Sequence, residues 1–551
     1  MPAARRTLSG VLGRRTQSLK MNRLASREEA EEARRRIAAR LDAAHEWFLR
    51  ERRGRSRVEL RAGEWELRAN ASALVFSYWG AAGVRAWRIV AWAFEGDALL
   101  LEATRRMGAE RALLELVPRA RVATAREVVA EARRAECERV ASLLLEHAES
   151  VRAGAKLERA WLSAGARRGE PGRWARVLLL LGRERDAATA PVVPTRADDA
   201  ESFLASALLW LARLDERYAG TARVRSLWLA APRALAGAVR ERVPLLRDSI
   251  RKRVSVLEFD GTESDEVESN DECSPLTTLH APSLEELLRE PVQRLLHPSS
   301  RPWNELTESV VALAPDAIDV VRARRGETLR FNGLPFARVR NVAGREHLWF
   351  GVEGAQRRTP LDDASAHGLL KLVAELLEHR RADAPERRHV LYRAAPEAWL
   401  ESLLRRDVSR LDPGLRLAPL HAQFRASRSG TGGARPVDLL AIRRDGRLVV
   451  IELKVSEDAA LALQGADYWR RVEAHRRQGN ITRARLFGDA HVADEPALVY
   501  LVAPMLRFHR SFQTLARTVT PKIETYRLDI NEDWRACVRV VRRVALTNSR
   551  Q

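Results

Sequence analysis

The stretch VDLLAIRRDGRLVVIELKV joins two short apolar runs through an Asp-Gly pair. Asp445 and Gly446 provide the positive-φ positions that a tight turn needs, so a β-hairpin is expected. Alternation with period two places Glu452 and Lys454 on one face of the second strand. Asp438 begins the first strand, on the neighbouring ladder. Two carboxylates and an ammonium are therefore expected to meet at one end of this hairpin.

Packing alone does not favour these charges, because burying an ionised carboxylate is costly unless a partner compensates it. A divalent cation is a natural partner, and oxygen ligands from Asp438 and Glu452 suit Mg²⁺ or Mn²⁺. Such a cation lowers the pKa of bound water and neutralises charge on a phosphoryl group. Lys454 would then position or deprotonate the attacking water, or stabilise the phosphate in the transition state.

The following stretch, SEDAALALQGADYWRRVEAH, is expected to be a helix with Ser456 as its N-cap. Gln464 and Tyr468 are four residues apart and therefore share one helical face. An amide and a phenol on that face can hold a water molecule or a DNA phosphate beside the cation.

These segments together resemble the PD-(D/E)xK nuclease superfamily, most of all the NucS/EndoMS-type endonucleases, with a QxxxY element similar to that of RecB-type nucleases. The resemblance implies a restriction-endonuclease-like mixed sheet flanked by helices and a metal-dependent phosphodiesterase. By this resemblance Asp438 and Glu452 match the metal ligands, Lys454 matches the catalytic lysine, and Gln464 and Tyr468 match QxxxY.

The superfamily also uses a glutamate on a helix before the core. The stretch PEAWLESLLRRDVSRLDPGLR resembles that helix and offers Glu397 and Glu401 on one face, and the sequence leaves the choice between them open. The resemblance covers roughly residues 391–510. It departs from the family pattern at Pro436, which precedes Asp438 by one extra residue.

A chain of 551 residues is too long for one hydrophobic core, so several domains are expected. The fold class predicted is multidomain α+β and α/β. Residues 124–165 show a helical pattern that opens the fourth of the expected segments. These segments are a basic disordered tail at 1–20, a helical arm at 21–56, a small β-rich module at 57–120, an α/β domain at 121–260, an acidic linker at 261–280, an α+β module with a short β-meander at 281–390, and the nuclease-like domain at 391–551.

The α/β domain at 121–260 invites comparison with the nuclease-like domain. The spacing from Asp199 to Trp210 equals that from Asp458 to Trp469, and SLWLAAP echoes LVYLVAP. We expect a degenerate copy of the same fold that serves as a scaffold or DNA clamp. The alternative is that any strand–helix–strand unit rich in Ala and Leu looks alike. In this alignment the copy lacks the chemistry, because Glu452, Lys454, Gln464 and Tyr468 are replaced by Val193, Thr195, Ala205 and Leu209.

The formal net charge of +21 favours a polyanionic partner. However, only six of the 95 basic residues are lysine, which resembles the Arg and Ala enrichment of proteins from a GC-rich genome. DNA is the expected partner, with RNA also compatible and a homodimer possible for this kind of nuclease. Three scattered cysteines and the lack of a long apolar run favour a cytoplasmic protein without a membrane segment. The cysteines are Cys137, Cys273 and Cys537.

Other residues have a functional and a structural interpretation. His509, Arg507 and Arg510 can contact phosphate, and Trp399 and Trp469 can stack on a base, but core packing or solvation explains each equally simply. Arginine pairs at 404–410, 443–444 and 470–471 flank the expected site as phosphate clamps or as solvated charge. The predicted function is a metal-dependent DNA nuclease, an endonuclease in DNA repair or in defence against foreign DNA. The alternative is a non-catalytic DNA-binding or scaffolding protein that retains the nuclease fold.

Overall fold

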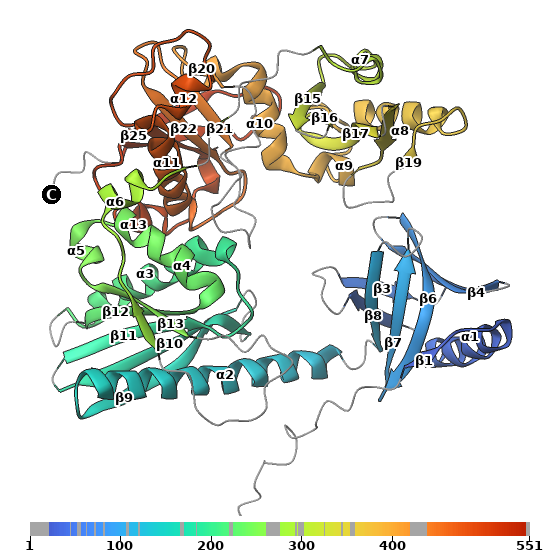
Figure 1. Ribbon diagram of the computed structural model, residues 1–551, viewed down its shortest axis with the longest axis horizontal. Helices are drawn as coiled ribbons and strands as arrows, with labels where there is room; N and C mark the ends of the chain where they lie inside the picture. The colour runs from blue at the N-terminus through green and yellow to red at the C-terminus, as the bar shows by residue number, and fades with distance from the viewer. Residues whose placement is uncertain are drawn as a thin grey trace, which may run out of the picture. The chain divides into compact units, whose positions relative to one another are not determined.

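The computed structural model divides the chain into two compact units, which are Met1–Val129 with Gly351–Arg358, and Ala130–Phe350 with Thr359–Gln551. Each unit is described by itself (Figure 1). None of the helices in the described part of the chain combines the length and apolar character that a bilayer span requires. The structure describes residues 21–44, 46–51, 57–61, 63–70, 73–80, 83–105, 110–118, 122–165, 170–182, 184–219, 224–259, 276–292, 295, 302–323, 326–342, 345–352, 359–418 and 438–546. The expected tail at 1–20 lies outside these residues.

The first unit is built on an eight-stranded antiparallel sheet with the order β3-β2-β8-β7-β6-β5-β4, in which β1 pairs with β6. Alternating apolar residues of these strands bury one face, and the β-rich segment expected at 57–120 lies within this sheet, which also contains earlier strands. The strands are β1 Asn22–Arg23, β2 Glu46–Glu51, β3 Arg57–Arg61, β4 Trp65–Asn70, β5 Ala73–Gly80, β6 Gly83–Glu95, β7 Ala98–Arg105 and β8 Glu110–Pro118.

The expected helical arm at 21–56 is wrong in two respects. Helix α1 (Arg27–Asp42) begins with a capping box between Ser26 and Glu29, but its buried residues, among them Ile37, pack in the core of the sheet instead of forming an exposed arm. The segment EWFLRE then forms β2, paired with β3 and β8. Trp47 and Leu49 are both buried, which is the period-two pattern of a strand.

The second unit contains a first six-stranded sheet, β14-β13-β12-β11-β10-β9. Long helix α2 covers one face, whereas α3 and α4 cover the other (Figure 1). The helical pattern expected through residue 165 ends earlier, because α2 stops at Val151 and a strand follows. The elements are α2 Val122–Val151, β9 Ala155–Ala164, β10 Pro171–Leu181, β11 Glu184–Pro191, α3 Ala200–Arg217, β12 Val224–Pro232, α4 Arg233–Arg242, α5 Asp248–Arg251, β13 Val254–Phe259 and β14 Thr277–Leu279.

A small α+β module follows, and the short β-meander expected within residues 281–390 is present as a five-stranded antiparallel sheet. The acidic run at 260–275 lies outside the described residues, and 277–279, predicted as linker, is strand β14. Helix α6 (Leu284–Arg289) packs against α11 (Leu461–Arg477) and lies outside this module. The module consists of α7 Glu305–Val311, β15 Ile318–Ala323, β16 Gly326–Phe331, β17 Leu334–Val342, β18 Arg345–Phe350, β19 Thr359–Pro360, α8 Ala366–His379 and α9 Val390–Arg393.

The C-terminal segment forms a second six-stranded mixed sheet, β20-β21-β22-β23-β24-β25. Helix α11 packs on one face and α10 on the other, each within its own apolar core. A mixed sheet flanked by helices is thus present where the sequence predicted it. Its elements are α10 Pro396–Arg406, β20 Arg416–Leu417, β21 Leu439–Ile442, β22 Leu448–Leu453, α11 Leu461–Arg477, α12 Asn480–Arg483, β23 Leu498–Pro504, α13 Phe512–Ala516, β24 Thr525–Ile530 and β25 Val540–Ala545.

The two six-stranded sheets have the same topology. Both run in sequence order from one edge to the other, with antiparallel, antiparallel, parallel, parallel and antiparallel neighbours. In both, a helix connects the third and fourth strands, which are the first parallel pair: α3 in one and α11 in the other. The shared strand order supports the expected copy, and we call the two parts the N-terminal half (155–279) and the C-terminal half (416–545).

Strand registers correct the expected alignment of the copy. β12 and β23 end in the matching Leu-Ala-Ala-Pro and Leu-Val-Ala-Pro, so Leu229 corresponds to Leu501. Thr189 pairs with Leu229, and Glu452 pairs with Leu501. Thr189 is therefore the counterpart of Glu452, and Pro191, two residues on, is the counterpart of Lys454. The prediction of Val193 and Thr195 was wrong because the connection from this strand to its helix is longer in the N-terminal half.

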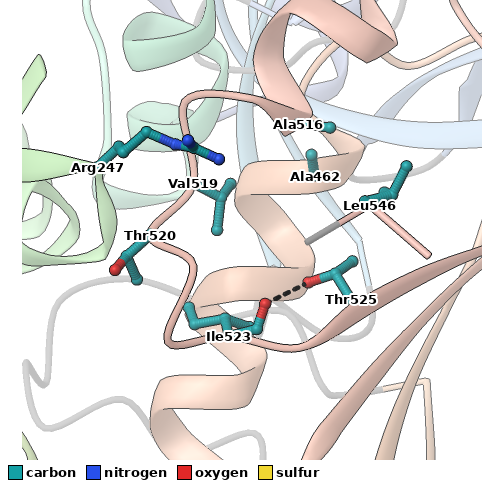
Figure 2. Close-up of a pocket in the computed structure, with 8 residues that line it drawn as sticks. All are labelled: Arg247, Ala462, Ala516, Val519, Thr520, Ile523, Thr525 and Leu546. Carbon is teal, nitrogen blue, oxygen red and sulfur yellow. Dashed lines mark hydrogen bonds between the residues drawn. The ribbon is translucent and has the colours of Figure 1, made fainter. Parts of the chain in front are cut away.

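The two halves meet through equivalent segments, each lying between the fourth and fifth strands. Leu246 and Val519 form an antiparallel bridge. On either side of it, Arg247 N donates to Thr518 O at 2.7 Å and Thr520 N donates to Leu245 O at 2.8 Å. Figure 2 shows the seam, with Arg247 of the N-terminal half beside Val519 and Thr520 of the C-terminal half around a small cavity. Contact of the same patch on both partners is the arrangement of a two-fold dimer, here within one chain.

Candidate active site

The predicted hairpin is present, and it brings Asp438 beside Glu452. Leu439 pairs with Ile451 across β21 and β22, so Asp438 is at the next ladder position. Gly446 has a φ of 84°, which the turn requires. The side chains of β22 are buried on both faces of the sheet, as expected for a strand in its interior.

Glu452 and Lys454 point to the same side of the sheet and contact each other. Lys454 Nζ lies 2.7 Å from Glu452 Oε1, and only 1% and 7% of Glu452 and Lys454 are exposed. Asp438 is half-buried, and its Oδ2 accepts a hydrogen bond from Leu453 N at 2.8 Å. The structure therefore brings the two carboxyls and the amine together, as the sequence predicted.

The acids repel each other in this environment. Burial, more than any other cause, raises the pKa of Asp438 to about 6. Burial and then the charge of Asp438 raise the pKa of Glu452 well above its usual value. Burial lowers the pKa of Lys454, but the charges of Glu452 and Asp438 outweigh this effect and raise it. Burial and mutual repulsion therefore make each acid bind a proton more readily than a free carboxyl does.

Helix α11 places Gln464 and Tyr468 on this side of the sheet, and both are buried. Burial raises the pKa of Tyr468, and the charges of Glu452 and Asp438 raise it further, so the phenol lies close to the acids. Gln464 Oε1 and Glu452 Oε2 are buried, and no donor among the described residues reaches either oxygen. Each of these unsatisfied acceptors is a polar atom that a bound cation or water would satisfy.

Gly465 allows this helix to approach β23 closely. A Cβ on residue 465 would lie 2.6 Å from Leu501 Cδ2 and 3.0 Å from Val499 Cγ1. Gly465→Ala is therefore expected to lower the free energy of unfolding by about 1–3 kcal/mol through overpacking, measured by chemical denaturation. Gly237→Ala in α4 is the matched control, because its Cβ would meet nothing within 4 Å and should stabilise by about 0.5–1 kcal/mol. Equal effects of the two substitutions would contradict a close approach at Gly465.

The two candidate glutamates of α10 have different surroundings. Glu401 Oε1 lies 2.8 Å from Arg405 and 3.5 Å from Arg330, and its charge contributes to the raised pKa of Asp438. Glu397 has no ion pair with any described residue, and its charge contributes to the raised pKa of Lys454. Both lie near the site. Glu397 is the one whose carboxylate is free to join it.

A pocket of about 390 Å³ adjoins the site. It includes Val455 and Ser456, which follow Lys454, and Pro396, which precedes Glu397. Three arginines line this pocket, and one of them is Arg507, which the sequence analysis named as a residue able to contact phosphate. These arginines are Arg393, Arg507 and Arg535.

Other predicted residues have structural roles. Trp469 Nε1 donates to Ala497 O at 2.8 Å, and Trp399 packs against Tyr392 and Trp534, so neither is available for base stacking. His509 Nδ1 accepts a hydrogen bond from Ser511 N. The arginine pairs are largely engaged with acids, which removes Arg405, Arg443, Arg470 and Arg471 as free phosphate clamps.

The residues present fit a hard divalent cation, although the described residues contain no group of three or more acidic, His or Cys side chains arranged to hold a metal. Asp438 and Glu452 supply oxygen ligands, an unsatisfied Glu452 oxygen is available, and Mg²⁺ commonly uses two carboxylates with water completing its shell. A cation there would relieve the repulsion that raises both pKa values.

Two features of the site had no clear signal in the sequence. Arg405 bridges Glu401 and the carbonyl of Asp438, with Nη2 2.9 Å from that oxygen, and only the arginine pair marked it. Asp467, between Gln464 and Tyr468, is fully buried among arginines, and no motif or spacing in the sequence marks it. Comparisons with protein-family models, with curated proteins and with solved structures find no match for this chain.

Proposed function

We propose that the C-terminal half is a metal-dependent nuclease that hydrolyses phosphodiester bonds in DNA. The observation that carries the proposal is the pair of acids, Asp438 and Glu452, buried beside Lys454 with an unsatisfied carboxylate oxygen. Nothing in the packing of the sheet requires these charges, and their mutual repulsion costs stability. Such a cost is typical of residues kept for binding or catalysis.

Asp438 and Glu452 would hold Mg²⁺ or Mn²⁺, which when bound supplies an activated water and neutralises charge on the phosphate. Lys454 would place its ammonium against the reacting phosphate. Gln464 and Tyr468 would orient water or a phosphate oxygen from the helix side. The arginine-lined pocket beside Ser456 would receive the flanking strand.

Asp438→Ala is expected to lower the rate of cleavage at least about 10³-fold with Mg²⁺ or Mn²⁺, because it removes a ligand of the proposed cation. The measurement is hydrolysis of flapped, mismatched, single-stranded and double-stranded substrates by the full chain. Circular dichroism and thermal denaturation serve to verify that the variant is folded. Undiminished cleavage by Asp438→Ala would refute the assignment.

One observation favours a second candidate, a DNA-binding or scaffolding protein without catalysis. Lys454 already occupies one oxygen of Glu452 at 2.7 Å, and the described residues contain no group of three or more acidic, His or Cys side chains arranged to hold a metal. In that case DNA binds with Mg²⁺, Mn²⁺ or Ca²⁺ but is never cut. The same substrates assayed for binding and for turnover separate the two candidates.

A further inference from the structure

The N-terminal half carries an arginine where the C-terminal half carries its first acid. The pair Val177–Ala188 of the N-terminal half is equivalent to the pair Leu439–Ile451 of the C-terminal half. The next ladder position in the N-terminal half is Arg176. In the other half that position belongs to Asp438. At equivalent positions of the two sheets, the N-terminal half therefore has a guanidinium and the C-terminal half has a carboxylate.

The rest of the N-terminal counterpart cannot hold a cation. Thr189, at the position of Glu452, is buried and donates its hydroxyl to Ala175 O at 2.7 Å. Pro191 is at the position of Lys454, and the connecting helix α3, AESFLASALLWLARLDER, contains neither Gln nor Tyr. The N-terminal half therefore lacks the proposed metal ligands and carries the positive charge of Arg176 instead.

Arg176 differs from the other buried arginines of this unit in having no acceptor. Arg242 forms a hydrogen bond with Glu201 at 2.7 Å, and Arg380 donates to several carbonyls, including Leu391 O at 2.7 Å. By contrast, no described residue offers the half-buried Arg176 guanidinium a hydrogen bond or a carboxylate. Unsatisfied donors on a half-buried cation favour an anion from outside the chain.

The surroundings of Arg176 are aromatic and basic. Its guanidinium lies 5.7 Å from the ring centroid of Trp210, and Trp210 is in edge-to-face contact with Trp161. Trp161 is the cross-strand partner of Arg176 and is partly exposed. Burial, and then the charge of Arg213, lowers the pKa of Arg176 to about 10, so it remains protonated at neutral pH. These residues form a small cationic site with tryptophan walls.

We infer that the N-terminal half binds a phosphate group of a nucleic-acid strand through Arg176, at the place where the C-terminal half carries Asp438. The guanidinium supplies the paired donors that suit phosphate oxygens. The positive charge that a cation would bring to the C-terminal site is supplied here by the chain itself. The inference extends the proposed function, since it takes nucleic acid as the ligand, but it needs no hydrolysis.

The test measures binding of the full chain to labelled single-stranded and duplex oligonucleotides by fluorescence anisotropy in chelator, where cleavage cannot interfere. Arg176→Gln is expected to weaken binding about 3–10-fold and to reduce the slope of log affinity against log salt by about 0.7–0.9, as loss of one phosphate contact requires. The control Arg152→Gln removes an exposed arginine that is paired with Glu184 of the N-terminal half and should leave the slope unchanged.

A second variant keeps the arginine. Thr189 is the direct cross-strand partner of Arg176, so Thr189→Glu gives the guanidinium a carboxylate and should weaken binding as Arg176→Gln does, whereas Thr189→Gln should not. Unchanged affinity and slope in folded Arg176→Gln and Thr189→Glu would overturn the inference and leave a structural cation–π contact. The inference would also be overturned if inorganic phosphate stabilised only the wild type while the wild type and all variants bound the oligonucleotides equally well. Cleavage plays no part in this readout, so a failure of the proposed hydrolysis would not affect it.

Discussion

Asparagine at position 438 is expected to raise the stability of the metal-free protein while abolishing cleavage. The pKa of Asp438 is raised to about 6, mainly by burial, so its charge is unfavourable in the folded state. The amide keeps an oxygen for the bond from Leu453 N. Above pH 6 in chelator, the free energy of unfolding should increase by about 1–3 kcal/mol.

The pH dependence of the free energy of unfolding shows in which direction the charge of Asp438 acts. A carboxyl whose pKa is raised on folding contributes stability that is present below its unfolded value, near 4, and lost as the pH rises through 6. Wild type and Asp438→Asn should therefore have similar stability near pH 4 and diverge between pH 4 and 6. Denaturation curves in chelator measure this, and Mg²⁺ should then stabilise the wild type only. Asp438→Asn being less stable than wild type at pH 8 would contradict the buried repulsion.

Asparagine in place of Asp467 is expected to have the opposite effect and to be costly. Asp467 is fully buried and accepts hydrogen bonds from Arg470 at 2.7 Å and from Arg242 of the N-terminal half at 3.4 Å. Removing one partner of a buried charge network leaves the others uncompensated, which costs about 3–5 kcal/mol. Thermal and chemical denaturation of the full chain measure the loss.

Asp248→Asn is the matched control, because Asp248 is paired with Arg251 only at the surface and should change stability by less than about 0.5 kcal/mol. Burial alone would raise the pKa of Asp467, but Arg242 and the neighbouring arginines hold it below its usual range. The stability that Asp467 provides is therefore present above pH 4 and lost below it, and Asp467→Asn should lack this loss. A variant as stable as the control would show that the network contributes little.

The sequence predicted the parts of the site that depend on local periodicity. Period two placed Glu452 and Lys454 on one face, the Asp-Gly turn fixed the partner strand, and the four-residue spacing placed Gln464 and Tyr468 together. Each of these relations spans few residues and follows from backbone geometry. They are also the relations that the structure reproduces.

Relations between distant residues could not be predicted. The contact between Arg242 and Asp467 joins residues 225 positions apart, and neither residue type nor spacing in the sequence indicates such a partner. Similarly, the counterpart of Glu452 in the N-terminal half depended on the length of a loop, which the helical spacing from Asp199 to Trp210 could not give. The sequence predicts helix for the segment EWFLRE, whereas in the structure it is a strand whose partners β3 and β8 follow later in the chain.

The equivalent halves that meet through Leu246 and Val519 carry only one set of the proposed metal-binding acids. Paired nucleases sever both strands because each partner brings its own acids, whereas here one partner has Arg176 and Thr189 in their place. If the C-terminal half hydrolyses DNA, each encounter breaks one backbone and leaves a nick. A supercoiled circle would then relax to the open form and stay unbroken across its second strand until another molecule arrives.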